Sequence, residues 1–405
     1  MDGDCGVDRY KILRLRDRPI LPLIAASFFV LTFAIKAFTD GPYVRGEVSS
    51  AVAYSKYFTA LVACLAALAY MLKGGETKFV AEFNKLMMIA VVFCTVSLVL
   101  QLMTGRFSAT VFMELFKFIM PIVLAYCILN ALDDREVWGC MVCVLAVSLT
   151  AYFFELRSQD ASFASFFSAD FEDFNSETES SGFAEIALML VFYFAYMKKS
   201  KMALAVSAIF SILAFKRLAM IVTLVVLFLC IFAPKTTEGR VPRKLVVALK
   251  ALTILVAMIW VWLLLPEQEL LFADLFGKFP SEFTMGRSDT LRYLYLGDFH
   301  SYGYGSANET VNAVFGVPFE MDLAKIAIEL TPIVAIVFVW LFWDLAGDSF
   351  WGVVIIGYYM INMITSDSLN SNFAFTLAYI VIGTVGYRHK SAKGQFDHAV
   401  DESKG

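Results

Sequence analysis

Charged side chains are scarce in this 405-residue sequence. Only 17% of the residues are Asp, Glu, Lys or Arg, whereas 59% are hydrophobic and the mean hydropathy is +0.70. Ordinary soluble domains contain about 25% charged residues, so the composition excludes that class and indicates a polytopic membrane protein. The net charge of -4 says little about partners, because in a membrane protein the placement of charge matters more than its sum.

Groups for metal or nucleotide chemistry are also few. The chain has three histidines, two of them near its carboxyl end, and they show no spacing typical of metal ligands. No phosphate-cradling P-loop and no dinucleotide fingerprint follows a predicted strand. These absences favour chemistry without a metal or cofactor, with a substrate supplied from the lipid and not from a nucleotide.

The seven cysteines do not predict a disulfide framework. Cys140 and Cys143 form a C-x-x-C pair, but the pair lies in an apolar segment without a second pair, so we expect core packing and not zinc or redox chemistry. Four others lie inside apolar runs, where cysteine behaves as a small hydrophobic side chain: Cys64, Cys94, Cys127 and Cys230.

The apolar segments predict an all-α fold with about twelve transmembrane helices. We expect them near residues 20–38, 51–72, 86–103, 111–129, 137–154, 182–197, 202–214, 218–232, 246–265, 323–343, 350–365 and 373–387. Basic residues crowd the segment before the first helix and the segment after the last, which places both termini in the cytoplasm. The chain then divides into an amino-terminal tail (1–19), nine helices (20–265), one large outer loop (266–322), three helices (323–387) and a carboxyl-terminal tail (388–405).

Two cations lie where this topology disfavours them. Lys216 and Arg217 occupy the tip of the hairpin formed by the seventh and eighth helices, and the basic residues on either side of that hairpin put its tip outside. We expect the pair to bind an anion at the outer face of the membrane. The alternative is snorkelling of two long side chains toward lipid headgroups.

The polar stretch at 280–322 of the outer loop carries most of the remaining chemistry. Arg287 and Arg292 can hold phosphate oxygens by paired, charge-assisted hydrogen bonds, so with the hairpin cations they predict a site for a lipid phosphate or pyrophosphate. A turn at Gly303, Tyr304 and Gly305 follows. Candidate bases for an acceptor hydroxyl are Glu320, Asp322, His300 and Glu185.

Other charges admit two interpretations. Glu114 and Lys117 stand three residues apart in the fourth helix, where they either pair with each other or line a groove for a lipid carrier. The acidic segment at 155–181 is either a mobile lid or a solvated connector.

Three segments resemble the O-antigen polymerase and ligase superfamily, which contains Wzy-type polymerases and WaaL-type ligases. ILAFKRLAMIVTLVVLFL resembles its hairpin, with Arg217 at the place of an arginine. GRSDTLRYLYLGDFHSYGYGSAN resembles its pattern of an arginine, a hydrophobic helix and a His-x-x-Gly-x-Gly turn, at Arg287, His300, Gly303 and Gly305. FEMDLAKIAIELTPI resembles the start of the next helix, with Glu320 where ligases have histidine, and this difference favours a polymerase.

The resemblance implies a GT-C-like, metal-independent membrane glycosyltransferase in a bacterial inner membrane. Such an enzyme would move a growing glycan from undecaprenyl pyrophosphate to a lipid-linked repeat unit at the periplasmic face, without a cofactor or nucleic acid and with a chain-length regulator as a possible partner. Arg217 and Arg287 would clamp the pyrophosphate, Arg292 and Lys216 would assist, and Asp322 or Glu320 would guide the acceptor.

Two alternatives remain open. One is a ligase that delivers the glycan to a lipid A core or to a protein. The other is a polysaccharide transporter or flippase, in which the charges in the apolar helices mark a path through the bilayer: Lys36, Lys56, Glu114 and Lys117.

Overall fold

A computed structural model describes residues 20–74, 80–158, 181–237, 239–369 and 371–402. Within these ranges the regular elements are helices and no strand forms. The prediction of an all-α fold is therefore confirmed for this part of the chain. The acidic segment predicted as a lid or connector falls mostly in residues 159–180, which lie outside the described ranges.

Six helices are long and apolar enough to cross a membrane, by length and composition. They are α1 (Ile20–Val44), α2 (Ser50–Leu72), α3 (Val80–Thr104), α4 (Ala109–Ala131), α5 (Asp134–Ser158) and α11 (Arg243–Leu263). Many of their apolar side chains face outward, for example Leu65, Val91 and Leu252 at 53–60% exposure. An apolar surface of this extent needs lipid as its solvent, so the chain is a multi-pass membrane protein.

The remaining apolar helices are shorter. They are α7 (Ser181–Met197), α8 (Lys201–Leu213), α9 (Arg217–Phe232), α17 (Pro332–Trp343) and α18 (Phe350–Thr365). The last helix, α19 (Asn372–Glu402), is longer, and its first half is apolar. Every segment that the sequence predicts to cross the membrane, except 323–343, corresponds to one helix in the described residues, and the tight α8–α9 hairpin lies where it is expected.

The tenth predicted helix, 323–343, is not one continuous helix. It is divided into α16 (Asp322–Leu330) and α17 by Thr331, which adopts φ 107° and ψ 152°. Pro332 explains the break, because proline removes an amide donor and disfavours helical conformation in the residue before it. A β-branched residue at positive φ is strained, so the surrounding packing must hold this break in place.

Two helices form the centre of the bundle. Almost every side chain of α7 from Phe183 to Ala195 is buried, and so is the apolar part of α19 from Phe373 to Val385. The two helices pack against each other, and α19 also packs on α4. A helix that is apolar around its whole circumference is stable only when it is enclosed on all sides, which accounts for this central position.

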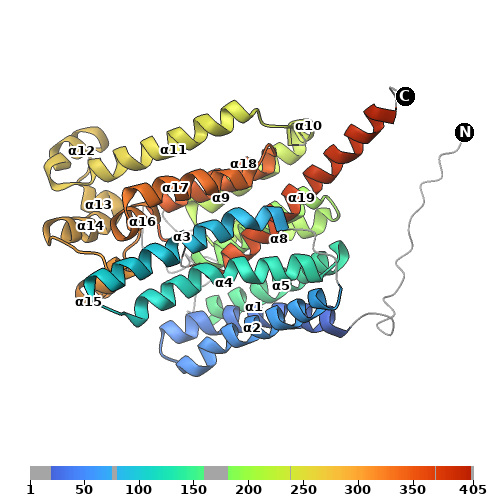
Figure 1. The fold of residues 1–405 in the computed structure, drawn as a ribbon, viewed down its shortest axis with the longest axis horizontal. Helices are drawn as coiled ribbons and strands as arrows, with labels where there is room; N and C mark the ends of the chain where they lie inside the picture. Colours follow the sequence, from blue (N-terminus) through green and yellow to red (C-terminus); the bar gives the residue numbers. More distant parts are fainter. Residues whose placement is uncertain (1–19, 75–79, 159–180, 238, 370, 403–405) are drawn as a thin grey trace, which may run out of the picture.

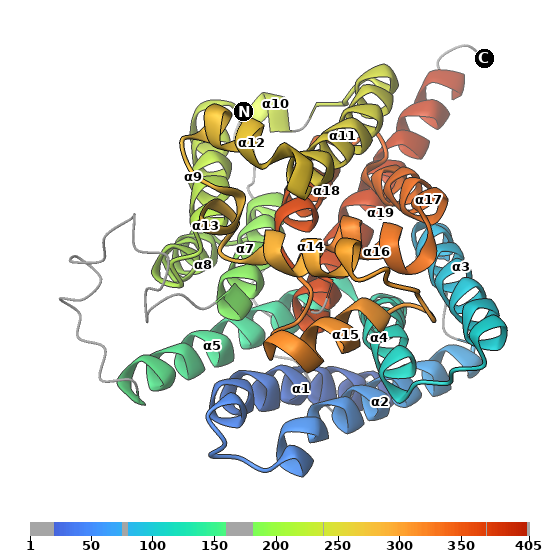
Figure 2. The same cartoon turned by 90° about the vertical axis from the view of Figure 1, so that its left-hand side faces the viewer.

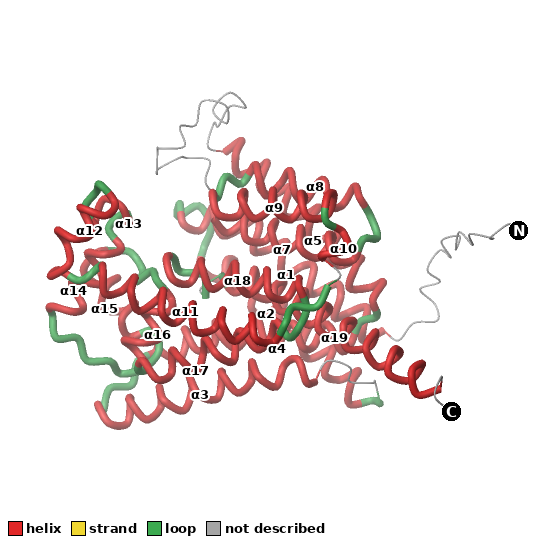
Figure 3. The backbone as a smooth tube through the Cα atoms, turned by 90° about the horizontal axis from the view of Figure 1, so that it is seen from above, coloured by secondary structure: helices red, strands yellow, loops and turns green. Residues whose placement is uncertain are grey.

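The large predicted loop folds into a cap of short helices over one end of the bundle. The cap, residues 266–321, contains a 3₁₀ turn (Pro266–Gln268), α12 (Glu269–Phe276), α13 (Pro280–Thr284), α14 (Arg287–Leu296) and α15 (Ser306–Phe315). Figures 1 and 3 show the cap at one end, and in Figure 1 the start of α1 and the end of α19 lie at the opposite end. A small core joins the cap to the ends of α11 and α16: Leu263, Leu264, Phe272, Leu291, Leu294, Ala307, Val311, Phe319, Met321 and Ala324.

Candidate functional site

Arg287 and Glu320, both predicted site residues, form an ion pair on the cap. Arg287 is the first residue of α14, and Gly286 before it turns the chain with φ 81°. The two side chains are 27% and 35% exposed, so solvent and solutes reach them. The arginine is therefore positioned by a carboxylate that a stronger anion can replace.

Arg292 has a bracing role in the structure. Its Nε donates to the Leu264 carbonyl oxygen at 3.1 Å, and its Nη1 lies 3.1 Å from Glu269 Oε2. These contacts fasten α14 to the end of α11 and to the start of α12. The Arg292 side chain is only 15% exposed, so it holds these elements together and has little contact with solvent.

Lys216 and Glu185 meet at the other predicted cation pair. The Lys216 Nζ lies 2.7 Å from Glu185 Oε1, and the Asn362 amide donates to the same oxygen at 3.1 Å. The Glu185 side chain is 3% exposed, and its second oxygen is buried without a hydrogen-bond partner. Arg217, the next residue after Lys216, begins α9 and is half-buried. Glu185 is thus held between α7, α9 and α18 as a counter-ion.

Asp322 and His300 differ sharply in accessibility. Asp322 is fully buried, and its Oδ2 accepts hydrogen bonds from the amides of Ser368 (2.6 Å) and Leu369 (2.9 Å). It therefore ties the start of α16 to the link between α18 and α19. His300 is exposed, and its Nδ1 lies 2.7 Å from the Asp298 carbonyl oxygen. Of these two candidate bases, only His300 is open to solvent.

The predicted Gly303–Tyr304–Gly305 turn is buried deeply between α3 and α4. Gly303 and Gly305 have φ values of 130° and 102°. A Cβ at Gly305 would lie 2.7 Å from Glu114 Cγ, so only glycine fits there. Tyr304 is 1% exposed, and its amide donates to Ser97 Oγ at 3.1 Å. The turn anchors the cap to the membrane helices.

A buried charge network beneath this turn was not predicted from the sequence. The Lys325 Nζ lies 3.0 Å from Glu114 Oε2, and Lys117 Nζ lies 2.8 Å from Glu114 Oε1. The expected pairing of Glu114 with Lys117 is therefore confirmed, but Glu114 serves a second, fully buried lysine as well. The Asn308 amide donates to Glu114 Oε2 at 3.2 Å. The one signal in the sequence was a charge inside an apolar helix, which calls for a partner.

Glu329, one turn after Lys325, completes the anchoring. Its two carboxylate oxygens accept hydrogen bonds from the amides of Gly305 and Ala307, both at 2.7 Å. The Lys325 ammonium also lies 4.8 Å from the centre of the Tyr304 ring, within range of a cation–π attraction. The break at Thr331 comes two residues later, so the strained backbone adjoins this network.

The short link between α3 and α4 also contacts the cap, at Glu309 in α15. Glu309 accepts a hydrogen bond from Ser108 Oγ at 2.5 Å and lies 3.2 Å from an Arg106 nitrogen. Burial alone would raise the pKa of Glu309, but the Ser108 hydroxyl and the Arg106 charge outweigh it and lower the pKa overall. Arg106 also stacks 3.8 Å from the Tyr302 ring centre. Burial raises the pKa of Tyr302 to about 12.

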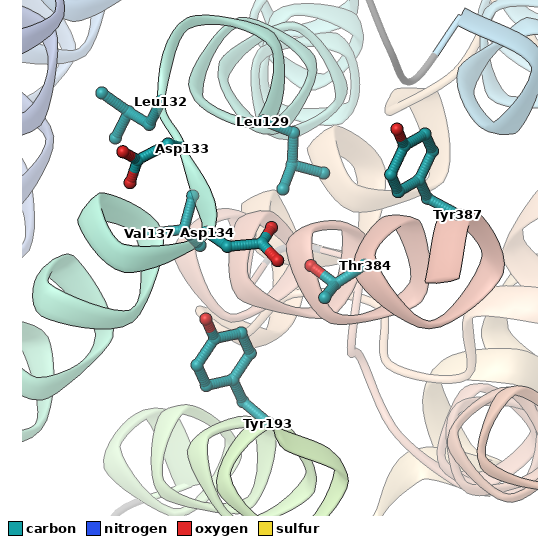
Figure 4. A pocket seen from close by; sticks show the side chains of 8 residues that line it. All are labelled: Leu129, Leu132, Asp133, Asp134, Val137, Tyr193, Thr384 and Tyr387. Atoms are coloured by element: carbon teal, nitrogen blue, oxygen red, sulfur yellow. The ribbon is translucent and has the colours of Figure 1, made fainter. Parts of the chain in front are cut away.

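A cavity of about 330 Å³ lies at the other end of α4, away from the cap. Figure 4 shows the side chains that line it: Leu129, Leu132, Asp133, Asp134, Val137, Tyr193, Thr384 and Tyr387. None of the predicted site residues is among them. We place the functional site at the cap because the accessible Arg287, its partner Glu320 and the buried turn at Gly303–Gly305 are all there.

The described residues contain no group of three or more His, Cys, Asp and Glu side chains that could hold a metal ion. Cys140 is buried in α5, as core packing requires, whereas Cys143 is exposed on the helix surface, and both are free thiols. Comparison with protein-family models, with curated proteins and with solved structures finds no match to this chain.

Proposed function

We propose that this protein is a polysaccharide polymerase that transfers a growing glycan from undecaprenyl pyrophosphate to a lipid-linked repeat unit. The observation that carries the proposal is the partly exposed Arg287–Glu320 pair on a cap that is hydrogen-bonded to the membrane helices. An arginine fixed at the membrane boundary is suited to a diphosphate leaving group, on which negative charge builds as the glycosidic bond breaks. The resemblance to the O-antigen polymerase and ligase superfamily supports the same assignment.

The proposed topology has twelve transmembrane helices, both termini in the cytoplasm and the cap in the periplasm of a bacterial inner membrane. The start of α1 and the end of α19 lie at the end of the bundle opposite the cap, which is consistent with this topology (Figure 1). The α3–α4 link, expected outside from the sequence, contacts the cap through Glu309. Five of the apolar helices, α7, α8, α9, α17 and α18, are shorter than the roughly 20 residues that cross a bilayer without a break, so local thinning of the bilayer or added loop residues must complete them.

In the proposed clamp, Arg217 and Arg287 bind the pyrophosphate, and Lys216 and Arg292 assist them. Both Lys216 and Arg287 are held by carboxylates, Glu185 and Glu320, which fix the geometry of the cations before substrate arrives. The diphosphate then displaces Glu320 from Arg287, since its two phosphate groups together carry two negative charges and compete well with a single carboxylate.

Glu320 is the best-placed base among the four candidates. Of the two accessible candidates, Glu320 is bonded to Arg287, whereas the Nδ1 atom of His300 lies 2.7 Å from the Asp298 carbonyl oxygen. Asp322 and Glu185 are buried among partners that they hold in place. In the proposed reaction an acceptor hydroxyl loses its proton to Glu320 and attacks the anomeric carbon. The bond from that carbon to the pyrophosphate breaks, and undecaprenyl pyrophosphate leaves with the electron pair. Asp322 instead guides the acceptor indirectly, by holding the start of α16.

A transporter is the second candidate, and one observation favours it. The α16–α17 segment is a discontinuous helix, with Lys325 and Glu329 close to its break, and broken helices often surround the binding sites of transporters. The polymerase is preferred because Lys325 and Glu329 are fully bonded to Glu114 and to the cap, which leaves them no free role in transport. A ligase would use the same clamp with a different acceptor.

The test is the glycan profile of a deletion strain complemented with variants. Loss of the protein should collapse the polysaccharide ladder to a single repeat unit, and Arg217→Ala or Arg287→Ala should fail to restore it, since one lost charge-stabilising donor costs about 10²-fold or more in rate. Arg45→Ala is the matched control, because Arg45 is a surface arginine paired with Glu47. Lipid-linked polymer accumulating beside undecorated acceptor would point to a ligase, and repeat units trapped on the inner leaflet would point to a flippase.

A further inference from the structure

Two lysines on the first two helices share a single carboxylate. The Lys36 Nζ lies 2.7 Å from Asp40 Oδ2, and Lys56 Nζ bonds to Asp40 Oδ1. The lysine side chains are only 14% and 12% exposed, so they do not reach out to solvent as snorkelling lysines do. Asp40 is 37% exposed, so the group is open to solvent on the carboxylate side. Asp40 alone bonds directly to both ammonium groups, so an anion that replaces it meets two cations.

Aromatic rings form the floor of this group. The centre of the Phe373 ring lies 5.7 Å from Lys36 Nζ and 5.9 Å from Lys56 Nζ. Tyr57 packs on Phe373, and its hydroxyl accepts a hydrogen bond from Asn372 at 3.2 Å. The carbonyl oxygen of the Asn372 side chain is buried and has no partner. Rings on one side limit hydration of the ammonium groups, which strengthens their attraction for an anion.

A third lysine extends the positive surface. Lys117 on α4 lies within electrostatic range of Lys56 and is 29% exposed. Its partner Glu114 is shared with the buried Lys325, so four ammonium groups rest on two carboxylates. Two further acids lie nearby. Glu155 packs against Gly41, and Glu329 is bonded to two backbone amides of the cap.

The group formed by Lys36, Lys56 and Asp40 and the Arg287–Glu320 ion pair lie in different parts of the same end of the molecule. Lys36 and Asp40 lie near the end of α1 and Lys56 near the start of α2, which is the end covered by the cap. In Figure 2, which looks onto that end, α1 and α2 run along one edge, whereas α9, α12 and α13 lie away from it. Gly182 at the start of α7 faces Lys36, and a Cβ placed there would lie 4.0 Å from the ammonium nitrogen, so Gly182 itself leaves space beside Lys36.

We propose that Lys36 and Lys56, assisted by Lys117, form a second anion site that holds the diphosphate of the second lipid-linked glycan. The proposal rests on the proposed function, because an enzyme that joins two lipid-linked glycans must hold two lipid diphosphates at once. The arginine clamp takes one of them, and the lysine site takes the other. Binding needs no covalent step: phosphate oxygens take the place of Asp40 beside the two ammonium groups.

The experiment titrates inorganic pyrophosphate into the purified full-length protein in lipid nanodiscs and measures stoichiometry and affinity by calorimetry. We expect two sites. Lys36→Gln/Lys56→Gln should remove one of them or weaken it about tenfold or more, because hydrogen bonds to charged groups are strong. Arg287→Gln should weaken the other. Lys73→Gln is the matched control, since Lys73 lies at the other end of α2 and is exposed.

Asp40→Asn separates anion binding from a structural role of the lysines. It removes the competing carboxylate but keeps both ammonium groups, so pyrophosphate should bind at least about threefold more tightly. Weaker binding in Asp40→Asn would overturn the proposal, and so would unchanged binding in the double lysine variant. If the double lysine variant loses a pyrophosphate site and Arg287→Gln loses none, the lysine site is supported and the arginine clamp is refuted. If Arg287→Gln loses a site and the double lysine variant loses none, the arginine clamp is supported and the lysine site is refuted.

The source of the phosphate is tested in the same system. Short-chain phosphatidylglycerol is added as a competitor during the pyrophosphate titration. The proposal expects it to leave the lysine site largely occupied by pyrophosphate. Displacement of pyrophosphate by phosphatidylglycerol at equal concentration would identify an ordinary headgroup site and would overturn the assignment to a lipid diphosphate.

Discussion

Replacing Gly305 with alanine should strongly destabilise the attachment of the cap. Gly305 has φ 102°, and an alanine Cβ would lie 2.7 Å from Glu114 Cγ. Such a backbone conformation costs a non-glycine residue about 1–3 kcal/mol. Overpacking adds about 1–3 kcal/mol, because Glu114 is held by Lys325, Lys117 and Asn308 and cannot move aside freely. We therefore expect a total loss of about 2–6 kcal/mol.

Gly316→Ala is the matched control for this prediction. Gly316 also has positive φ, 72°, but a Cβ there would meet nothing within 4 Å. It should cost only the backbone strain, about 1–2 kcal/mol. The assay is thermal unfolding of both variants in detergent, followed by proteolysis of the cap at a fixed temperature. Equal melting temperatures and equal cap proteolysis for Gly305→Ala and Gly316→Ala would refute the burial of the turn against α4.

Four further predictions follow from the contacts of the cap. Lys325→Met should destabilise the protein by about 3–5 kcal/mol in thermal unfolding, since it leaves a buried carboxylate with one cation fewer, and adding Glu114→Gln should recover part of that loss. The pKa of Glu309 is lowered in the folded protein, so the stability that Glu309 contributes is present above its unfolded pKa and is lost as pH falls through its folded pKa. The wild type should therefore lose more cap stability on acidification than Glu309→Gln. Identical pH profiles of the two proteins would contradict this. Glu320→Gln should abolish polymerisation in a glycan gel while tightening pyrophosphate binding in calorimetry, and intact polymerisation would remove Glu320 as the base. Leu296→Cys, at an exposed position on the cap, should react with a membrane-impermeant maleimide in intact spheroplasts, and labelling only after lysis would invert the topology.

The helices themselves could be predicted from the sequence, because long apolar runs have few structures open to them in a membrane. The α8–α9 hairpin was predicted by Lys216 and Arg217 between two such runs, and the Glu114–Lys117 pair by spacing within one helix. These features depend on neighbours in the sequence. The break at Thr331 was also readable from Pro332, but the apolar run on both sides of it concealed the discontinuity.

The partners of the candidate residues could not be predicted. Glu114 and Lys325 are 211 positions apart in the chain, and only the folded cap brings them together. The same holds for Glu185 with Lys216 and for Arg287 with Glu320. Sequence patterns record which residue types are present, but which acid neutralises which base depends on how the helices pack in three dimensions.

The most direct test of the central claim uses the purified protein with a defined undecaprenyl-pyrophosphate-linked repeat unit in detergent and chelator. We expect longer lipid-linked glycans together with release of undecaprenyl pyrophosphate, and neither product with Arg287→Ala. Unextended repeat units in the presence of folded wild-type protein, or full extension by Arg287→Ala, would contradict it.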